Sequence, residues 1–196
     1  GCPKLPPLVP VRPPLIPGSL APADRTEALA WTARMVPAHS TAIRFRFQFQ
    51  DKRRKVSGRG TVRVAPPDSL RFDYVGPLGM GAGAAVVVGD STVWADPEEN
   101  FRSLVPGIPM LWAALGIVRP PAPDTQVQSG GSGPSTQWRF ITGSDTLDYL
   151  ATDGVPRILE GEWRRDGKVM ARSRTEFAGR TFPTQAHVDF PEAPAR

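Results

Sequence analysis

The chain has 196 residues, a formal net charge of +5 and a single cysteine. A lone cysteine cannot form an intramolecular disulfide, and the two histidines, His39 and His187, are too few to complete a usual zinc site with it. No apolar run approaches the roughly 18 residues that a membrane-spanning helix needs. The composition therefore excludes a disulfide scaffold and argues against a metal site or a helical membrane span, and we expect no cofactor.

The basic excess of the chain predicts an anionic partner. Its isoelectric point is near 10.0, and the arginines lie mainly in strand-like segments rather than in one tail. Nucleic acid is a common partner of so basic a domain, but the sequence has no zinc-finger spacing, no RNP-like aromatic motif and no basic helix. We therefore expect no nucleic-acid binding, and phospholipid head groups or acidic protein surfaces are the anions that remain.

Cys2 and the proline-rich run after it predict a lipid anchor on a tether. Gly1 before Cys2 resembles the end of a bacterial lipoprotein signal, in which a small residue precedes the cysteine that is diacylglyceryl-modified. Prolines are too frequent between residues 3 and 22 for a helix or an interior strand. The alternatives are an ordinary unpaired thiol and a ligand for a proline-recognising module. Residues 1–22 would form the anchor and tether, residues 23–192 one globular domain, and residues 193–196 a tail.

Three segments have the pattern of helices. Residues 24–36 begin with Asp24 and carry Glu27 three residues later, which is a capping-box arrangement. Residues 97–104 place a proline and two acidic residues in the first turn, where the helix dipole favours them. Residues 109–117 are apolar all round, which indicates burial.

Nearly all the remaining sequence alternates with the period of two that is typical of half-buried strands. Strands are predicted at 43–49, 56–64, 70–74, 84–88, 91–95, 137–142, 146–151, 157–163, 168–177 and 184–190. Gly89-Asp90, Asp153-Gly154 and Asp166-Gly167 are hairpin signals between several of them. The predicted fold is mainly β, an antiparallel meander of about ten strands that curls into an incomplete barrel with a few covering helices.

The order of these elements resembles the LolB branch of the LolA/LolB-like lipoprotein carriers. The clearest local match is Gly76-Pro77-Leu78-Gly79, which is similar to a Pro-Leu-Gly turn between two strands of that family, and residues 101–118 resemble its mid-chain helices and loops. The resemblance implies that residues 23–192 are a lipid-binding domain whose apolar cavity receives acyl chains. It also implies a lipid-anchored protein on the periplasmic face of the outer membrane, with a LolA-like periplasmic donor. We expect it to act as a monomer.

The candidate cavity residues are large apolar side chains from the predicted apolar strand face and from the helices. They are Phe45, Phe47, Phe49, Val62, Leu70, Phe72, Tyr74, Trp94, Leu111, Trp112, Leu115, Trp138 and Phe140. Aromatic-rich strands are more often plain core than binding site. Periodicity cannot separate an open cavity from a filled core.

The turn at residues 76–83 is a candidate membrane-insertion loop, formed by Pro77, Leu78 and Met80. Its glycines permit tight backbone geometry, whereas leucine and methionine are poor choices for a solvated loop. The resemblance implies that an exposed leucine here helps deliver lipoprotein to the membrane, and Leu78 is the matching position. The alternative is that Leu78 and Met80 fold back as core.

No enzymatic motif is evident, and we expect no catalytic residue. The glycines at 79, 81 and 83 join strands instead of opening a phosphate-binding helix, and no serine lies in a GxSxG elbow.

Three hypotheses for the function remain. They are a carrier or receptor of acylated proteins, a structural or assembly lipoprotein whose filled domain binds a protein partner, and a carrier of free lipid or glycolipid.

Overall fold

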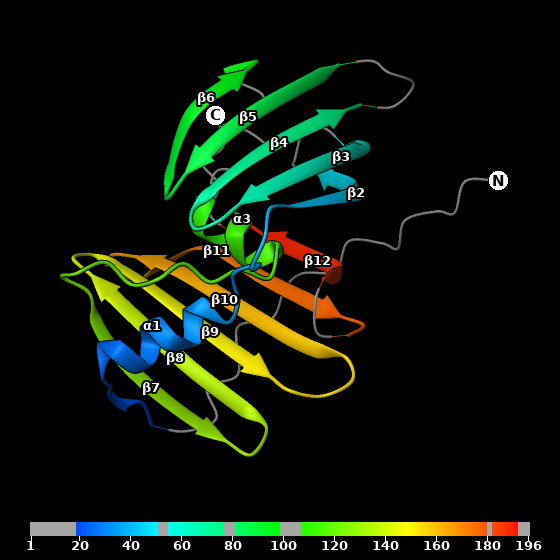
Figure 1. Ribbon diagram of the computed structural model, residues 1–196. Helices are drawn as coiled ribbons and strands as arrows, with labels where there is room; N and C mark the ends of the chain where they lie inside the picture. Colours follow the sequence, from blue (N-terminus) through cyan, green and yellow to red (C-terminus); the bar gives the residue numbers. More distant parts are fainter. Residues whose placement is uncertain (1–18, 51–54, 77–80, 99–106, 180–181, 192–196) are drawn as a thin grey trace. The chain divides into compact units, whose positions relative to one another are not determined.

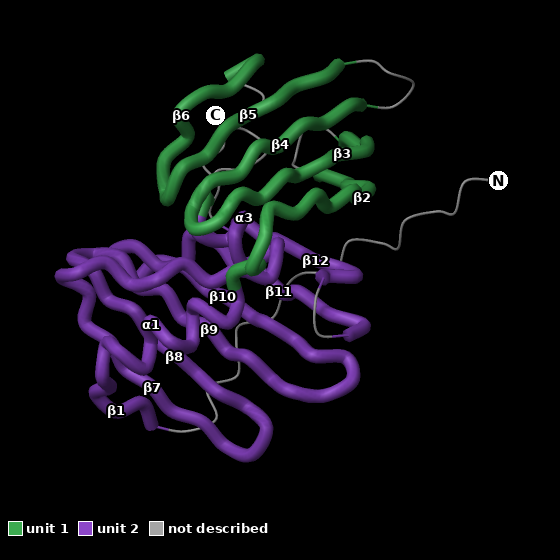
Figure 2. The backbone as a smooth tube through the Cα atoms, viewed as in Figure 1, with its two compact units in different colours: residues 1–7, 36–108 green, residues 8–35, 109–196 purple. Residues whose placement is uncertain are grey.

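The mainly β, antiparallel fold is confirmed. The computed structural model describes residues 19–50, 55–76, 81–98, 107–179 and 182–191, and within them it contains twelve strands and two helices (Figure 1). The strands form a five-stranded and a seven-stranded antiparallel sheet, and neither sheet closes into a barrel. Neither described helix has the length and apolar character of a membrane-spanning helix. The chain divides into two compact units, one around each sheet (Figure 2).

Unit 1 contains the five-stranded sheet and includes residues 36–108. Its strands are β2 (Thr41–Gln50), β3 (Lys55–Ala65), β4 (Ser69–Val75), β5 (Ala82–Val88) and β6 (Ser91–Asp96). Each strand pairs with the next one in the chain, so this sheet is a simple meander. Gly89 has a φ of 61° in the turn between β5 and β6, as the Gly89-Asp90 signal predicts.

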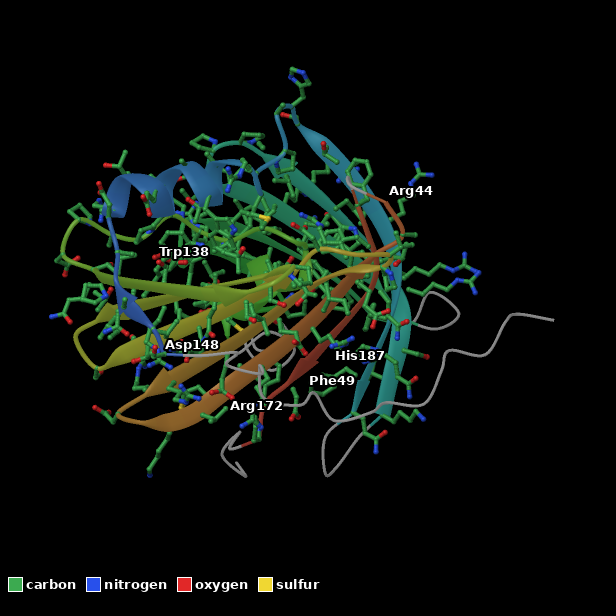
Figure 3. All side chains as sticks on the ribbon, turned by 90° about the horizontal axis from the view of Figure 1, so that it is seen from below. Arg44, Phe49, Trp138, Asp148, Arg172 and His187 are labelled. Atoms are coloured by element: carbon green, nitrogen blue, oxygen red, sulfur yellow. The ribbon has the colours of Figure 1, made fainter. Side chains whose placement is uncertain are left out.

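Alternation along β2 to β5 gives this sheet one aromatic and one polar face. In β2 the phenylalanines are half-buried, while the arginines between them are exposed. Figure 3 shows Arg44 and Phe49 on opposite sides of this strand. Glycines on β3 accommodate the rings, because a Cβ at Gly60 would stand 2.3 Å from the Phe45 ring and a Cβ at Gly58 would stand 2.8 Å from the Phe47 ring. The rings therefore lie flat across the neighbouring strand.

Unit 2 contains the seven-stranded sheet and includes residues 8–35 and 109–196. Its strands are β1 (Ala21–Pro22), β7 (Gln126–Ser132), β8 (Ser135–Thr142), β9 (Asp145–Thr152), β10 (Arg157–Arg165), β11 (Lys168–Phe177) and β12 (Pro183–Asp189). Strands β7 to β12 again pair in chain order, and β1 lies at the β7 edge. The Asp166-Gly167 signal marks the hairpin between β10 and β11, where the φ of these residues are 49° and 77°, as in a type I′ turn.

Two helices cover one face of the seven-stranded sheet. Helix α1 (Arg25–Ala33) is capped by Asp24, whose carboxylate accepts from the Thr26 N–H at 2.7 Å. It packs Trp31 against Trp138 on β8, with ring centroids 5.7 Å apart. Helix α3 (Ile108–Ala114) lies over β10 and β11, where the Thr175 hydroxyl donates to the Ala113 carbonyl at 2.8 Å. These contacts join both helices to one apolar core.

Two parts of unit 2 differ from the sequence-based expectation. Residues 126–132, for which no strand is predicted, form β7, and its hairpin with β8 has Gly133 at a φ of 58° in the turn. The predicted tether ends in a two-residue strand, because Ala21 and Pro22 pair with β7. Most of the helix predicted at 97–104 lies outside the described residues.

Candidate functional site

Seven of the predicted cavity residues share the aromatic face of the unit 1 sheet. Phe45, Phe47 and Phe49 are on β2, Val62 is on β3, and Leu70, Phe72 and Tyr74 are on β4. The rings form a continuous layer, since the centroids of Phe45 and Phe72 are 5.6 Å apart and those of Phe47 and Tyr74 are 6.1 Å apart. These residues share a face because the strands alternate without a break, and their role in a cavity stays a prediction.

Trp94 does not lie on the aromatic face with these seven residues, so its predicted place on the apolar strand face is wrong. The pairing of β5 with β6 shifts register between Val86 and Val87, so that Val93 is an extra residue in β6. The bulge changes the phase of the alternation. Trp94 therefore lies opposite Val86, on the polar face of the sheet, and is 47% exposed.

The other predicted cavity residues belong to unit 2. Trp138 and Phe140 are 5% and 3% exposed and lie in the core beneath the helices. Leu111 and Trp112 are on α3, and Leu115 follows its end. Trp112 is fully buried and Leu115 half-buried. These residues are therefore core or partly core in unit 2.

A groove in unit 2 lies between α1 and the ends of β8, β9 and β10. Its volume is about 490 Å³. Its apolar lining consists of Ala30, Trp31, Met35, Trp138 and Ala151, and its polar lining consists of Glu27, Arg34, Thr136, Asp153 and Arg157. Half of these lining residues are polar, which is more than is usual for a small-molecule site, whereas the volume is in the usual range. Of this lining, only Trp138 belongs to the residues predicted from the sequence.

Two side chains of the groove keep unused hydrogen-bond donors. The Trp138 Nε1 and the Arg157 Nε are buried and have no hydrogen-bond partner in the described part of the chain. The Arg157 guanidinium lies 4.0 Å over the Phe177 ring, and its Nη1 is 3.8 Å from the Met35 sulfur. Buried donors are normally paired. Both donors are buried, so an oxygen of a ligand in the groove would reach them only after the side chains around them move.

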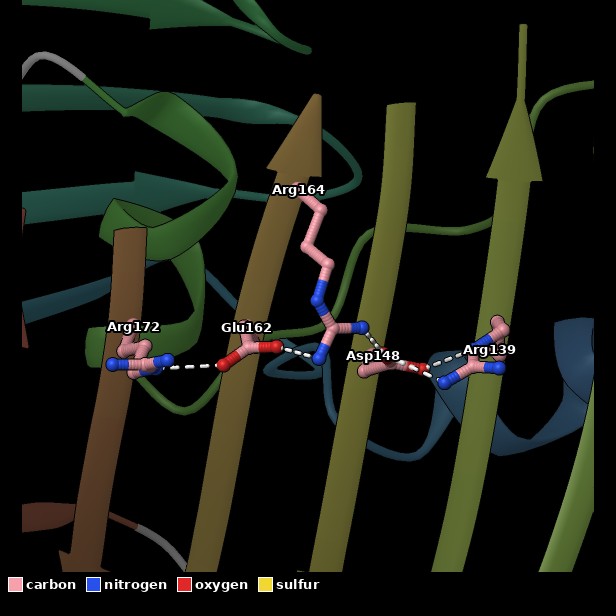
Figure 4. A network of polar contacts seen from close by, with 5 residues as sticks. All are labelled: Arg139, Asp148, Glu162, Arg164 and Arg172. Atoms are coloured by element: carbon pink, nitrogen blue, oxygen red, sulfur yellow. Dashed lines mark hydrogen bonds and ion pairs between the residues drawn. The ribbon is translucent and has the colours of Figure 1, made fainter. Parts of the chain in front are cut away.

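The opposite face of the seven-stranded sheet carries a ladder of ion pairs (Figure 4). Arg172 donates to Glu162 at 2.6 Å, Arg164 contacts both Glu162 and Asp148, and Arg139 donates to Asp148 at 2.6 Å. The ladder also includes Arg174, which pairs with Glu160 at 2.8 Å and with Glu176 at 3.2 Å. The four arginines and four carboxylates of this ladder balance one another, so it is a structural network that cross-links strands.

The remaining predicted site residues lie outside the described residues. They are Cys2, Pro77, Leu78 and Met80. The flanks of the turn are described, and the Gly76 N–H donates to the Gly81 carbonyl at 2.7 Å. Among the described residues, no group of three or more histidine, cysteine, aspartate or glutamate side chains could hold a metal ion. The side chain of His187 on β12 is half-buried and contacts Gln185.

The chain matches none of the protein-family models, curated proteins or solved structures with which it was compared.

Proposed function

We propose that this protein is a lipid-anchored carrier that binds the acyl chains of lipoproteins and helps insert them into the outer membrane. The observation that carries the proposal is the groove beside α1. It joins an apolar floor that includes Trp31 and Trp138 to a polar rim that includes the side chains of Arg34 and Arg157. An acyl chain with a carbonyl or carboxylate head would place its methylenes on the floor and its oxygens near the two arginine side chains of the rim. Each buried methylene contributes about 0.8 kcal/mol.

The aromatic face of unit 1 supports the same class of ligand. Phe45, Phe47 and Phe49 remain half-buried although their rings form an ordered layer. Burial of such a surface against acyl chains requires no specific polar contact. The anchor at Cys2, the membrane-insertion turn with Leu78 and the periplasmic donor belong to the proposal on the strength of the sequence resemblance.

A substitution that fills the groove tests the proposal. Ala30 is exposed on α1 and lines the groove. Ala30→Trp should weaken the binding of an environment-sensitive fluorescent fatty acid by about tenfold or more, because the indole would occupy the space of the ligand. Ala33→Trp is the matched control, since Ala33 is exposed on the same helix but does not line the groove.

Both variants should melt at the wild-type temperature. If the fatty acid binds neither wild type nor control, the domain is filled, and the structural or assembly role replaces the carrier role. Equal binding by wild type and both variants would remove the groove from the proposal.

A further inference from the structure

The pairing of the five strands in unit 1 places basic and apolar side chains together on one face. Side chains directly opposite each other on paired strands point to the same side of a sheet. One such row runs through Ala42, Arg63, Arg71, Val86 and Trp94. A second row joins Arg46, Arg59, Val75 and Ala82. We call this side of the sheet the arginine face.

Positive charge dominates the arginine face. Its described basic residues are Arg44, Arg46, Lys55, Arg59, Arg63 and Arg71, and its described acidic residues are Asp73 and Asp96. Asp73 binds Arg63 and Arg71, each at 2.8 Å. Arg44, Arg46 and Arg59 have no ion-pair partner among the described residues, in contrast to the balanced ladder of unit 2.

The arrangement of the arginines lowers the stability of the sheet. Arg46 and Arg59 are directly opposite each other on β2 and β3, and both are exposed. Like charges in that position are destabilising. The alternation of β2 requires only polar side chains here, as Gln48 and Gln50 on the same face demonstrate. An anionic partner would remove the repulsion.

Large apolar side chains share the face with the arginines. Trp94, Val75 and Val88 are 47%, 45% and 39% exposed. Trp94 is in the same row as Arg63 and Arg71, and Val75 is opposite Arg59. Tryptophan is enriched at the membrane–water interface, where its ring lies among the head groups. Basic residues beside exposed apolar ones are typical of surfaces that bind anionic bilayers.

We propose that the arginine face docks on the surface of a bilayer that contains anionic phospholipid. Arg44, Arg46 and Arg59 bind the phosphate groups, and Trp94 and the exposed valines enter the interfacial layer. A single strand of nucleic acid would instead require several aromatic side chains for base stacking among the cations, and in the described part of this face only Trp94 is aromatic. The docking is independent of the acyl-binding groove, which lies wholly in unit 2.

The test is cosedimentation of the full chain, carrying Cys2→Ser so that no lipid is attached, with vesicles. Vesicles of phosphatidylglycerol mixed with phosphatidylcholine should bind the protein, and vesicles of phosphatidylcholine alone should not. Each arginine replaced near the surface should cost about fivefold in affinity, so Arg46→Gln with Arg59→Gln should cost about twenty-fivefold. Raising the salt concentration should weaken the binding of the unsubstituted face.

The matched control is Arg165→Gln with Lys168→Gln, which removes the same charge from the hairpin of β10 and β11 in unit 2. This control variant should bind the anionic vesicles as tightly as the protein with an unsubstituted arginine face. The Ala30→Trp variant should also bind them as tightly, which would show that docking does not depend on the groove. Trp94→Ala should weaken binding by about threefold or more.

Equal binding by the Arg46 and Arg59 double variant and its control would overturn the proposal. Tighter binding of a single-stranded oligonucleotide or of an acidic protein than of the vesicles at the same salt would overturn it as well.

Discussion

At the scale of single residues, a few backbone positions determine how the elements end. Helix α3 ends in a Schellman motif, in which Gly116 donates to the Ala113 carbonyl at 2.9 Å and Ile117 donates to the Trp112 carbonyl at 3.0 Å. Gly116 has a φ of 78°, and a Cβ there would stand 2.6 Å from the Phe177 ring. Glycine is therefore required both by the backbone conformation and by the packing of α3 on β11.

Alanine substitution can separate these two requirements. Gly133 has a φ of 58° in the turn between β7 and β8, but nothing lies within 4 Å of its Cβ position. Gly133→Ala should lower the free energy of unfolding by about 1 kcal/mol, which is the cost of a left-handed backbone in a residue other than glycine. Gly116→Ala should cost about 2 kcal/mol more, because the Phe177 ring must also move. Urea unfolding of both variants measures the difference, and equal losses would show that Phe177 adapts freely.

Asp145 gives a testable dependence of stability on pH. The Arg165 guanidinium, with a second hydrogen bond from the Trp163 indole, holds the pKa of this carboxyl below its ordinary value. A lowered pKa in the folded state contributes stability that is present above the unfolded pKa, near 3.9, and is lost as the pH falls through the folded value. The Asp145→Asn variant should therefore lose less stability than wild type between about pH 5 and pH 2. The midpoints of urea unfolding of both proteins across this pH range test the prediction. Parallel plots of midpoint against pH for the variant and wild type would contradict it.

At the scale of elements, the strands could be predicted from the sequence because most of them alternate without interruption. All ten predicted strands are present, with bounds that differ by no more than two residues at either end. Strand β7 was missed because Gly130 and Gly131 have no side chain to show a period of two. Trp94 was assigned to the wrong face because the bulge at Val93 changes the phase, and nothing in the local sequence marks a bulge. The groove was missed because α1 and three strand ends form it, and that arrangement depends on tertiary packing.

The ion-pair ladder of unit 2 is the element-scale feature whose removal should be most costly. The side chain of Glu162 is fully buried and contacts Arg164 and Arg172. Glu162→Gln should lower the free energy of unfolding by about 3 kcal/mol, because both arginines lose the charge of a buried partner. Glu176→Gln is the matched control on the same face. It should cost about 0–1 kcal/mol, since Glu176 and Arg174 are each about one-third exposed. A loss at Glu162 as small as at Glu176 would mean that water screens the ladder.

At the scale of the whole molecule, the two sheets distribute charge differently. In unit 2 the arginines of the polar face are neutralised by carboxylates within the ladder, and the other face carries the helices and the groove. In unit 1 the polar face carries arginines without an ion-pair partner in the described part of the chain, and the other face is a layer of half-buried aromatic rings. Much of the basic excess of the composition thus lies on the arginine face of unit 1. The proposed binding of anionic lipid uses this face, and the proposed binding of acyl chains uses other surfaces.

The central claim, that the protein binds acyl chains, is tested most directly by native mass spectrometry of the full chain purified from membranes. We expect wild type and Ala33→Trp to carry a bound acylated peptide or lipid, seen as a mass above that of the chain and any lipid attached at Cys2. The groove-filling variant Ala30→Trp should carry much less. Wild-type protein that remains free of noncovalent ligand when an acylated peptide is added in excess would contradict the claim.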